Sequence, residues 1–180
     1  MIEMPPQIVN IDEAEEVDDL FVGQWGAFCK VLTPSMKPRG GRLGVNVSRV
    51  PKGHSSCPFH SHQREDEVFY VLSGRGVFRY GDTLRDIRAG DCIACPAGTG
   101  IAHQFANPFD EDLVFLGIGP SDPDEVCVYP DSGKVMVRSL HRVGYLEDID
   151  YLHGEPASLR IFELVEQRDG ASKADPEQPG

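Results

Sequence analysis

The chain has 180 residues, of which 40% are hydrophobic and 26% are charged, a size and composition typical of one globular domain with one core. Its net charge of −12 argues against a nucleic-acid partner, which requires a basic surface. No apolar stretch is long enough to span a bilayer, and the first residues lack the pattern of a signal peptide. The five scattered cysteines fit reduced thiols, so we expect a cytoplasmic protein with no membrane partner.

Residues 1–42 are predicted to form an acidic arm outside the folded core. Residues 1–20 contain seven acidic residues and no lysine or arginine, and prolines interrupt the first positions. We expect this arm to pack on the core or on a partner. Trp25, the only tryptophan of the chain, is a candidate contact with a second copy.

Residues 43–140 carry repeated signs of short strands. Runs rich in β-branched and aromatic residues are separated by turns that contain glycine. Strands are predicted at residues 43–50, 67–72, 77–80, 84–88, 92–95, 101–106, 113–118, 126–129 and 134–138. Short strands at regular spacing predict an all-β sandwich or barrel rather than a helical or βαβ protein.

Residues 141–180 are predicted to be a C-terminal extension. Residues 146–152 are expected to form a helical turn, and residues 158–166 are compatible with either a strand or a helix. The segment after Arg168 is polar, and we expect it to be mobile.

The most informative motif is His60-Ser61-His62, followed by Glu67 and, far downstream, by His103. Two histidines at positions i and i+2 of an extended strand point to the same face. A carboxylate a few residues later and an imidazole from a distant strand can complete a shell of four ligands. Such nitrogen and oxygen donors suit one divalent transition metal, with zinc, iron, manganese, nickel and cobalt left undistinguished.

Less specific interpretations compete with this one. An isolated His-x-His pair on a polar stretch is usually a solvated surface pair, and Asp66 would replace Glu67 as a ligand if the strand began one residue earlier. Cys92 and Cys95 have the spacing of a redox or zinc motif, but there is no second pair, so they are predicted to be core thiols.

Two stretches resemble the signatures of the cupin family. From His60 to Gly74, two histidines separated by one residue precede a glutamate and then a glycine, as in the first cupin signature. From Gly90 to Asn107, the order of glycine, proline, histidine and asparagine is similar to the second signature. The chain departs from the family pattern at Gly53, which lies one residue further from the first histidine, and in two extra residues between Pro96 and His103. Neither departure removes a ligand.

The resemblance is greatest to small single-domain cupins of undefined function. It implies a single jelly-roll barrel (a double-stranded β-helix) with N- and C-terminal arms, and a metal inside the barrel. It also implies a homodimer, which would cover the edge strands of the barrel. By residue, it implies a metal bound by His60, His62, Glu67 and His103.

The expected function is that of a metal-dependent enzyme on a small organic or carbohydrate-like substrate, with isomerase, lyase and dioxygenase chemistry left open. Phe69 and Phe105 could line the substrate pocket, although both could equally belong to the core. The other residues placed inward are mostly apolar, which weakens the case for proton transfer by a general base. The alternative is a non-catalytic cupin that binds or senses a sugar-like small molecule.

Overall fold

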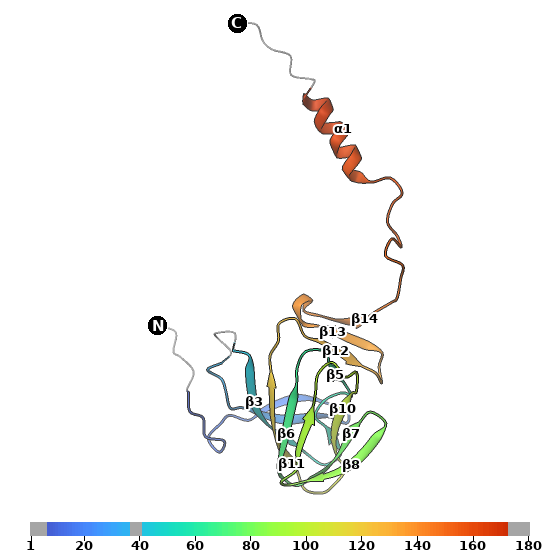
Figure 1. Ribbon diagram of the computed structural model, residues 1–180. Coiled ribbons are helices and arrows are strands. Elements are labelled where there is room, and N and C mark those ends of the chain that lie inside the picture. The colour runs from blue at the N-terminus through green and yellow to red at the C-terminus, as the bar shows by residue number, and fades with distance from the viewer. Residues whose placement is uncertain (1–6, 37–40, 173–180) are drawn as a thin grey trace. The chain divides into compact units, whose positions relative to one another are not determined.

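The computed structural model describes residues 7–36 and 41–172 (Figure 1). The chain forms two compact units, Met1–Leu146 and Glu147–Gly180, and each is described by itself. No helix in these two ranges has the length and the apolar character needed to cross a lipid bilayer.

The regular secondary structure described in the first unit is almost entirely β-strand, and most strands lie at the positions that the sequence predicts. Its strands are β1 Val17–Val22, β2 Trp25–Val31, β3 Leu43–Val50, β4 His54–Ser55, β5 Ser61–His62, β6 Glu67–Ser73, β7 Arg75–Tyr80, β8 Thr83–Arg88, β9 Cys92–Cys95, β10 His103–Asn107, β11 Leu113–Pro120, β12 Val126–Tyr129, β13 Lys134–Val137 and β14 Arg142–Tyr145. A 3-10 turn at Arg138–Leu140 connects the last two strands.

These strands form two sheets. The larger has the order β8-β7-β10-β4-β2-β3-β11-β6-β9, with β1 paired to β2, and it curls on itself (Figure 1). The smaller has the order β14-β13-β12-β5. Nearly all neighbouring strands are antiparallel, whereas β2 and β4 meet in a parallel pair. The fold is an all-β jelly roll, which confirms the fold class expected from the sequence.

Residues 17–31, which the sequence analysis assigns to an arm, contribute β1 and β2 to the larger sheet. Phe28 and Lys30 are paired with Arg49 and Val47 across β2 and β3. Acidic composition hides this strand pair, because Asp18 and Asp19 interrupt the apolar alternation of β1. The barrel therefore extends to the N-terminal side of Leu43.

The barrel core is built from alternate residues of facing strands. Val50, Val71 and Leu113 are fully buried. Phe105 lies at the centre of an aromatic cluster, with its ring 4.7 Å from that of Phe69 and 4.8 Å from that of Phe115. Each fully buried side chain of this size contributes about 1.5–3 kcal/mol of hydrophobic stabilisation.

Cys92 corrects one sequence-based expectation. Cys95 is buried opposite Glu67, as expected for a core thiol, but Cys92 is exposed. The reason is that residues three apart on a strand face opposite sides of the sheet. Cys92 thus lies on the outer face of the sheet, opposite Tyr70.

The second unit contains one helix, α1 Arg160–Ser172. This helix decides the ambiguity of residues 158–166 in favour of a helix. Residues 146–150 have no regular secondary structure, and turns at residues 151–154 take the place of the helical turn expected at 146–152. The expectation of a mobile tail falls largely on residues 173–180, which lie outside the described residues.

Candidate metal centre

Three separate segments bring the predicted ligands together at one end of the barrel. His60 directly precedes the short strand β5, and His62 is its last residue. Glu67 is the first residue of β6, and His103 is the first residue of β10. Paired backbone hydrogen bonds join His60 and His103, with N···O distances of 3.1 and 2.7 Å. This bridge fixes two of the four side chains relative to each other.

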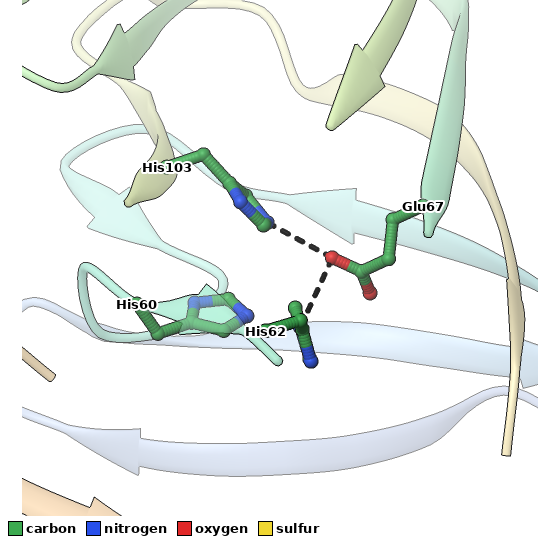
Figure 2. Close-up of side chains that lie close together, drawn as sticks. All are labelled: His60, His62, Glu67 and His103. Atoms are coloured by element: carbon green, nitrogen blue, oxygen red, sulfur yellow. Dashed lines mark ion pairs between the residues drawn. The ribbon is translucent and has the colours of Figure 1, made fainter. Parts of the chain in front are cut away.

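The three imidazoles and the carboxylate point toward one another (Figure 2). Glu67 Oε2 lies 2.9 Å from His103 Nε2 and 3.2 Å from His62 Nε2. The ring of His60 lies 4.8 Å from the ring of His62 and 4.5 Å from that of His103, measured between centroids. One potential ligand atom from each residue lies within 4.8 Å of the others.

Three of these converging atoms are buried without a hydrogen-bond partner in the described part of the chain: His62 Nε2, Glu67 Oε2 and His103 Nε2. They are close to each other, but their directions do not form hydrogen bonds. Leaving a buried polar atom unsatisfied costs about 1–3 kcal/mol. A divalent cation would satisfy all three atoms at once, so the arrangement fits the metal that the donor set predicts.

The protonation of His60 and of Glu67 agrees with this reading. Burial, together with the neighbouring His103 and His62, lowers the pKa of His60 to about 4, so His60 is neutral at pH 7. Burial opposes ionisation of Glu67, but the adjacent imidazoles of His103 and His62 hold its pKa well below the usual range. A neutral imidazole and an ionised carboxylate are the forms that bind a metal.

Residues on and next to the smaller sheet contact the Nδ1 atom of His62, the ring nitrogen that does not face the other ligands. Cys127, its partner across β5 and β12, places Sγ 3.3 Å from His62 Nδ1. Glu125 Oε1 lies 3.4 Å from the same nitrogen, and Glu65 Oε2 lies 3.6 Å from it. Burial disfavours a charge on His62, but Cys127 and the nearby Glu67 carboxylate raise its pKa to about 10. His62 is therefore protonated at pH 7, and a metal that binds Nε2 would displace this proton. These contacts orient the ring so that Nε2 faces the other ligands.

Glu125 also fixes the backbone that follows His62. It is fully buried, and its two carboxylate oxygens accept hydrogen bonds from the backbone N–H groups of Gln63 and Arg64 at 2.8 and 2.9 Å. Glu65 is paired with Arg138 and accepts the backbone N–H of Asp122 at 2.6 Å. Both buried charges are therefore compensated, as buried charges must be.

Sequence reasoning missed these supporting residues. Glu65 lies in an acidic run beside Glu67 and has the appearance of a solvated residue, and Cys127 and Glu125 lie some sixty positions beyond His62. The register between β5 and β12 brings Cys127 to His62, and no local spacing encodes that register. A metal-binding histidine almost always has a hydrogen-bond partner at its other ring nitrogen. This rule predicts that such partners exist, although it does not identify them in the sequence.

His60 has a similar support. Its Nδ1 lies 2.8 Å from the backbone oxygen of Pro58 and 3.8 Å from Cys57 Sγ.

Asp66, the alternative to Glu67, is exposed and accepts the backbone N–H of Ala97 at 2.8 Å, away from the cluster. The four-residue group in the structure contains Glu67 and not Asp66.

A cavity of about 780 Å³ opens beside the cluster, and His60 and Glu67 form part of its wall. Phe69 and Phe105, expected in the substrate pocket, line this cavity and also belong to the core. Phe78 packs in the core and is not part of the lining.

Comparison with known proteins places this architecture in a family. Residues 46–119 match the family model described as a cupin domain. The chain belongs to the cupin superfamily. The match includes three of the four clustered side chains from the first signature and His103 from the second, so the cluster lies within the cupin domain.

Two solved cupin-like structures resemble most of the chain. A protein of Acidithiobacillus ferrooxidans, provisionally described as a sugar phosphate isomerase, is 26% identical, with a TM-score of 0.69 over 79% of this cupin and 92% of its own chain. A sugar phosphate isomerase of Silicibacter pomeroyi is 25% identical, with a TM-score of 0.63 over 86% of this cupin and 98% of its own chain.

An oxalate-binding protein of Thermotoga maritima is 37% identical over 70 residues. This match covers 39% of the present cupin and 55% of the relative, so the chain spans about half the length of the curated relative that it matches.

Proposed function

We propose that this cupin binds one divalent first-row transition metal through His60, His62, Glu67 and His103 and is a metal-dependent enzyme for a small organic or carbohydrate-like compound. The observation that carries the proposal is the convergence, beside a cavity, of three buried ligand atoms that make no hydrogen bond in the described part of the chain. When bound, the metal would supply a Lewis acid that polarises an oxygen of the substrate.

The chain's own residues would orient the substrate and exclude water. Phe69, Phe105 and Phe115 form an apolar part of the cavity wall, and Asn46 and Ser48 on β3 add polar groups to the lining. Among the described lining residues, Asp19 is the one carboxylate that is not a proposed ligand, and it is exposed. Isomerase, lyase and dioxygenase chemistry all stay open, and the description of two similar structures as sugar phosphate isomerases favours testing isomerisation first.

The alternative function is binding or sensing without catalysis. It is supported by the similarity to a protein described as oxalate-binding. It is also supported by the scarcity of titratable groups in the described lining, since isomerases and lyases need a general acid or base near the metal.

We further propose a cytoplasmic homodimer. The outer face of β6 exposes Val68, Tyr70 and Leu72, and β8 and β9 form the edges of the larger sheet. Exposed apolar side chains and unpaired strand edges favour cover by a second copy. Analytical ultracentrifugation of the wild type and of Tyr70→Glu tests this proposal. A dimer that dissociates in the variant supports it, and a monomeric wild type contradicts it.

The test of function compares protein stripped of metal with protein reconstituted with zinc, iron, manganese or nickel. Each sample is assayed for aldose–ketose isomerisation, for oxygen consumption and for decarboxylation of oxalate. We expect one activity that depends on the metal and disappears in His62→Ala, but persists in His141→Ala, which changes an exposed histidine. Ligand binding without turnover in any assay would favour the binding protein over the enzyme.

A further inference from the structure

The cavity reaches the cluster of metal ligands from one side. His60 and Glu67 line the cavity, whereas His62 and His103 do not. The accessibilities agree, since the side chain of Glu67 is 24% exposed and those of His62 and His103 are 8% and 2% exposed. A compound in the cavity would therefore approach a bound metal from the side of Glu67 and His60.

Three glycines form the part of the cavity wall that adjoins Glu67. Gly117 and Gly119 lie two residues apart on β11, so they share a face of the strand, and Gly44 is the partner of Gly119 on β3. All three line the cavity. A Cβ atom at Gly119 would lie 3.3 Å from Glu67 Cγ, and one at Gly117 would lie 3.6 Å from the Phe69 ring. We call these three residues the glycine wall.

The backbone conformation does not require glycine in this wall. None of its three residues has a positive φ angle, in contrast to the turn glycines Gly74 and Gly90. Packing within the described residues does not require glycine at Gly44 or Gly117 either, because a Cβ atom there would lie at least 3.6 Å from every other atom. Glycine inside a strand is unfavourable for stability, and it often marks a place where a ligand approaches the backbone closely.

The missing side chains leave room beside Glu67. Neighbouring strands lie about 4.8 Å apart, so the pair of Gly44 and Gly119 widens the space across two strands. The rings of Phe69 and Phe105 form an apolar part of the same cavity wall. A ring or a branched carbon chain would fill such a space and bury its apolar surface there.

We propose that Gly44, Gly117 and Gly119 are specificity-determining residues, which allow an organic compound with a bulky apolar group next to its metal-binding end to reach the metal. The apolar group packs over the glycine wall and against the phenylalanine rings. A side chain in the wall excludes this compound but still admits a small one. The inference deepens the proposed function and rests on it, because it requires a metal at the four ligands.

The experiment uses protein loaded with cobalt(II), whose visible absorption spectrum changes when a compound binds to the metal. The probes are the 2-hydroxy acids glycolate, lactate and mandelate. They carry the same hydroxyl and carboxylate groups and differ only in a hydrogen, a methyl group or a phenyl ring on one carbon. Affinities are measured by spectral titration, and the cobalt content and the thermal unfolding of every protein are measured as well.

The variants are Gly44→Val and Gly117→Val, each with its alanine counterpart. Gly119 is left unchanged, because a side chain there would press on the ligand Glu67. The matched control is Gly144→Val on β14, which also replaces a strand glycine without a positive φ angle. A Cβ atom at Gly144 would meet nothing within 4 Å.

We expect all three acids to bind the wild type and Gly144→Val. In Gly44→Val and Gly117→Val, the affinity for mandelate should fall about tenfold or more, since even one methylene group in a pocket can produce a discrimination of this size. The affinity for glycolate and the cobalt content should be unchanged. The two alanine variants should unfold at temperatures no lower than that of the wild type, because alanine loses less conformational freedom than glycine on folding.

The inference would be overturned by a wild type that binds cobalt but not mandelate. It would also be overturned if mandelate bound both valine variants as tightly as the wild type, or if glycolate and mandelate lost affinity by the same factor. If the valine variants do not fold, the alanine variants decide by the same comparison of mandelate with glycolate. A wild type that takes up no cobalt contradicts the proposed function itself, and this inference with it.

Discussion

Strands β6 and β11 lie side by side and each connects the packed core with the metal centre. Their inward-facing residues are large and apolar at the core end and are glycine or a ligand at the other end. In the packed half, Val71 is paired with Phe115, and both are buried. Two residues further along, Phe69 is paired with Gly117, and beyond this pair Glu67 meets the glycine-lined wall of the cavity. Thus both strands pack the core at one end, while at the other end β6 supplies the ligand Glu67 and β11 supplies the glycines beside it. A few inward-facing positions, occupied by a ligand and by glycines in place of large apolar residues, are therefore enough to form a site on a rigid barrel.

The largest expected effect comes from the packed half. Leu113 is fully buried in the core, so Leu113→Ala should lower the free energy of unfolding by about 2–5 kcal/mol. The metal stoichiometry of the folded variant should not change. Urea denaturation and elemental analysis measure the two quantities. The control is Leu84→Ala, at an exposed leucine, for which the change should stay within about 0.5 kcal/mol. A loss of metal in Leu113→Ala would show that the two halves are not independent.

At the metal-binding end of the barrel, the free energy of unfolding should depend on the concentration of metal. Because the cation binds the folded chain and not the unfolded one, a concentration one hundred times the dissociation constant should raise the free energy of unfolding by about 2.7 kcal/mol. His103→Ala removes a ligand and should abolish this gain. Denaturation curves with metal and with a chelator test the prediction. An equal gain in wild type and in His103→Ala would show that the cation binds somewhere else.

A smaller effect is expected behind His62. Glu125→Gln keeps the size of a buried side chain that touches the backbone of Gln63 and Arg64, but it removes the charge near His62 Nδ1. Loss of such a partner typically weakens metal affinity about 10–100-fold. Competition with a chromophoric chelator measures the change. Glu111→Gln, at an exposed glutamate, should have no effect, and an unchanged affinity in Glu125→Gln would contradict the assigned support.

The smallest effect concerns a contact outside both halves. Glu16 accepts two hydrogen bonds from Arg49 on β3, and the hydrogen bonding lowers the pKa of Glu16 below 4.5. The folded state therefore binds this proton less readily than the unfolded state. The stabilisation is present above pH 4.5 and is lost as the pH falls through the lowered value. For such an accessible pair it amounts to less than about 1 kcal/mol.

Urea unfolding of wild type and Glu16→Gln between neutral and acidic pH measures this contribution. The two proteins should differ in stability at neutral pH and become equal in acid, while their metal affinities should be the same throughout. A difference in stability that grows as the pH falls would have the wrong sign for this contact.

Local patterns predict much of this molecule, and they fail where distant segments meet. Alternation and turn residues predict the strands from Leu43 onward, and the spacing of His60, His62 and Glu67 predicts residues that share one side of the barrel. The spacing does not reveal that Cys127 and Glu125 stand behind His62, since this depends on the register of β5 with β12. The exposure of Cys92 follows from its place on the outer face of β9, and which face is outer depends on how the whole sheet curls.

The N-terminal strands show the same limit. The acidic residues of β1 obscure the alternation that would predict a strand, and only pairing with β2 and then β3 makes that segment part of the sheet. The cavity is similarly hidden, because glycines in a sequence predict turns more readily than a missing wall. Gly117 and Gly119 acquire their role from the residues that face them, Phe69 and Glu67.

The measurement that tests the central claim most directly is the metal content of protein purified without chelators, determined by elemental analysis for the wild type, His62→Ala and His141→Ala. We predict about one equivalent of a first-row transition metal per chain in the wild type and in His141→Ala, and close to none in His62→Ala. A wild type that contains no metal, and takes up none when reconstituted with zinc, iron, manganese or nickel, would contradict the account.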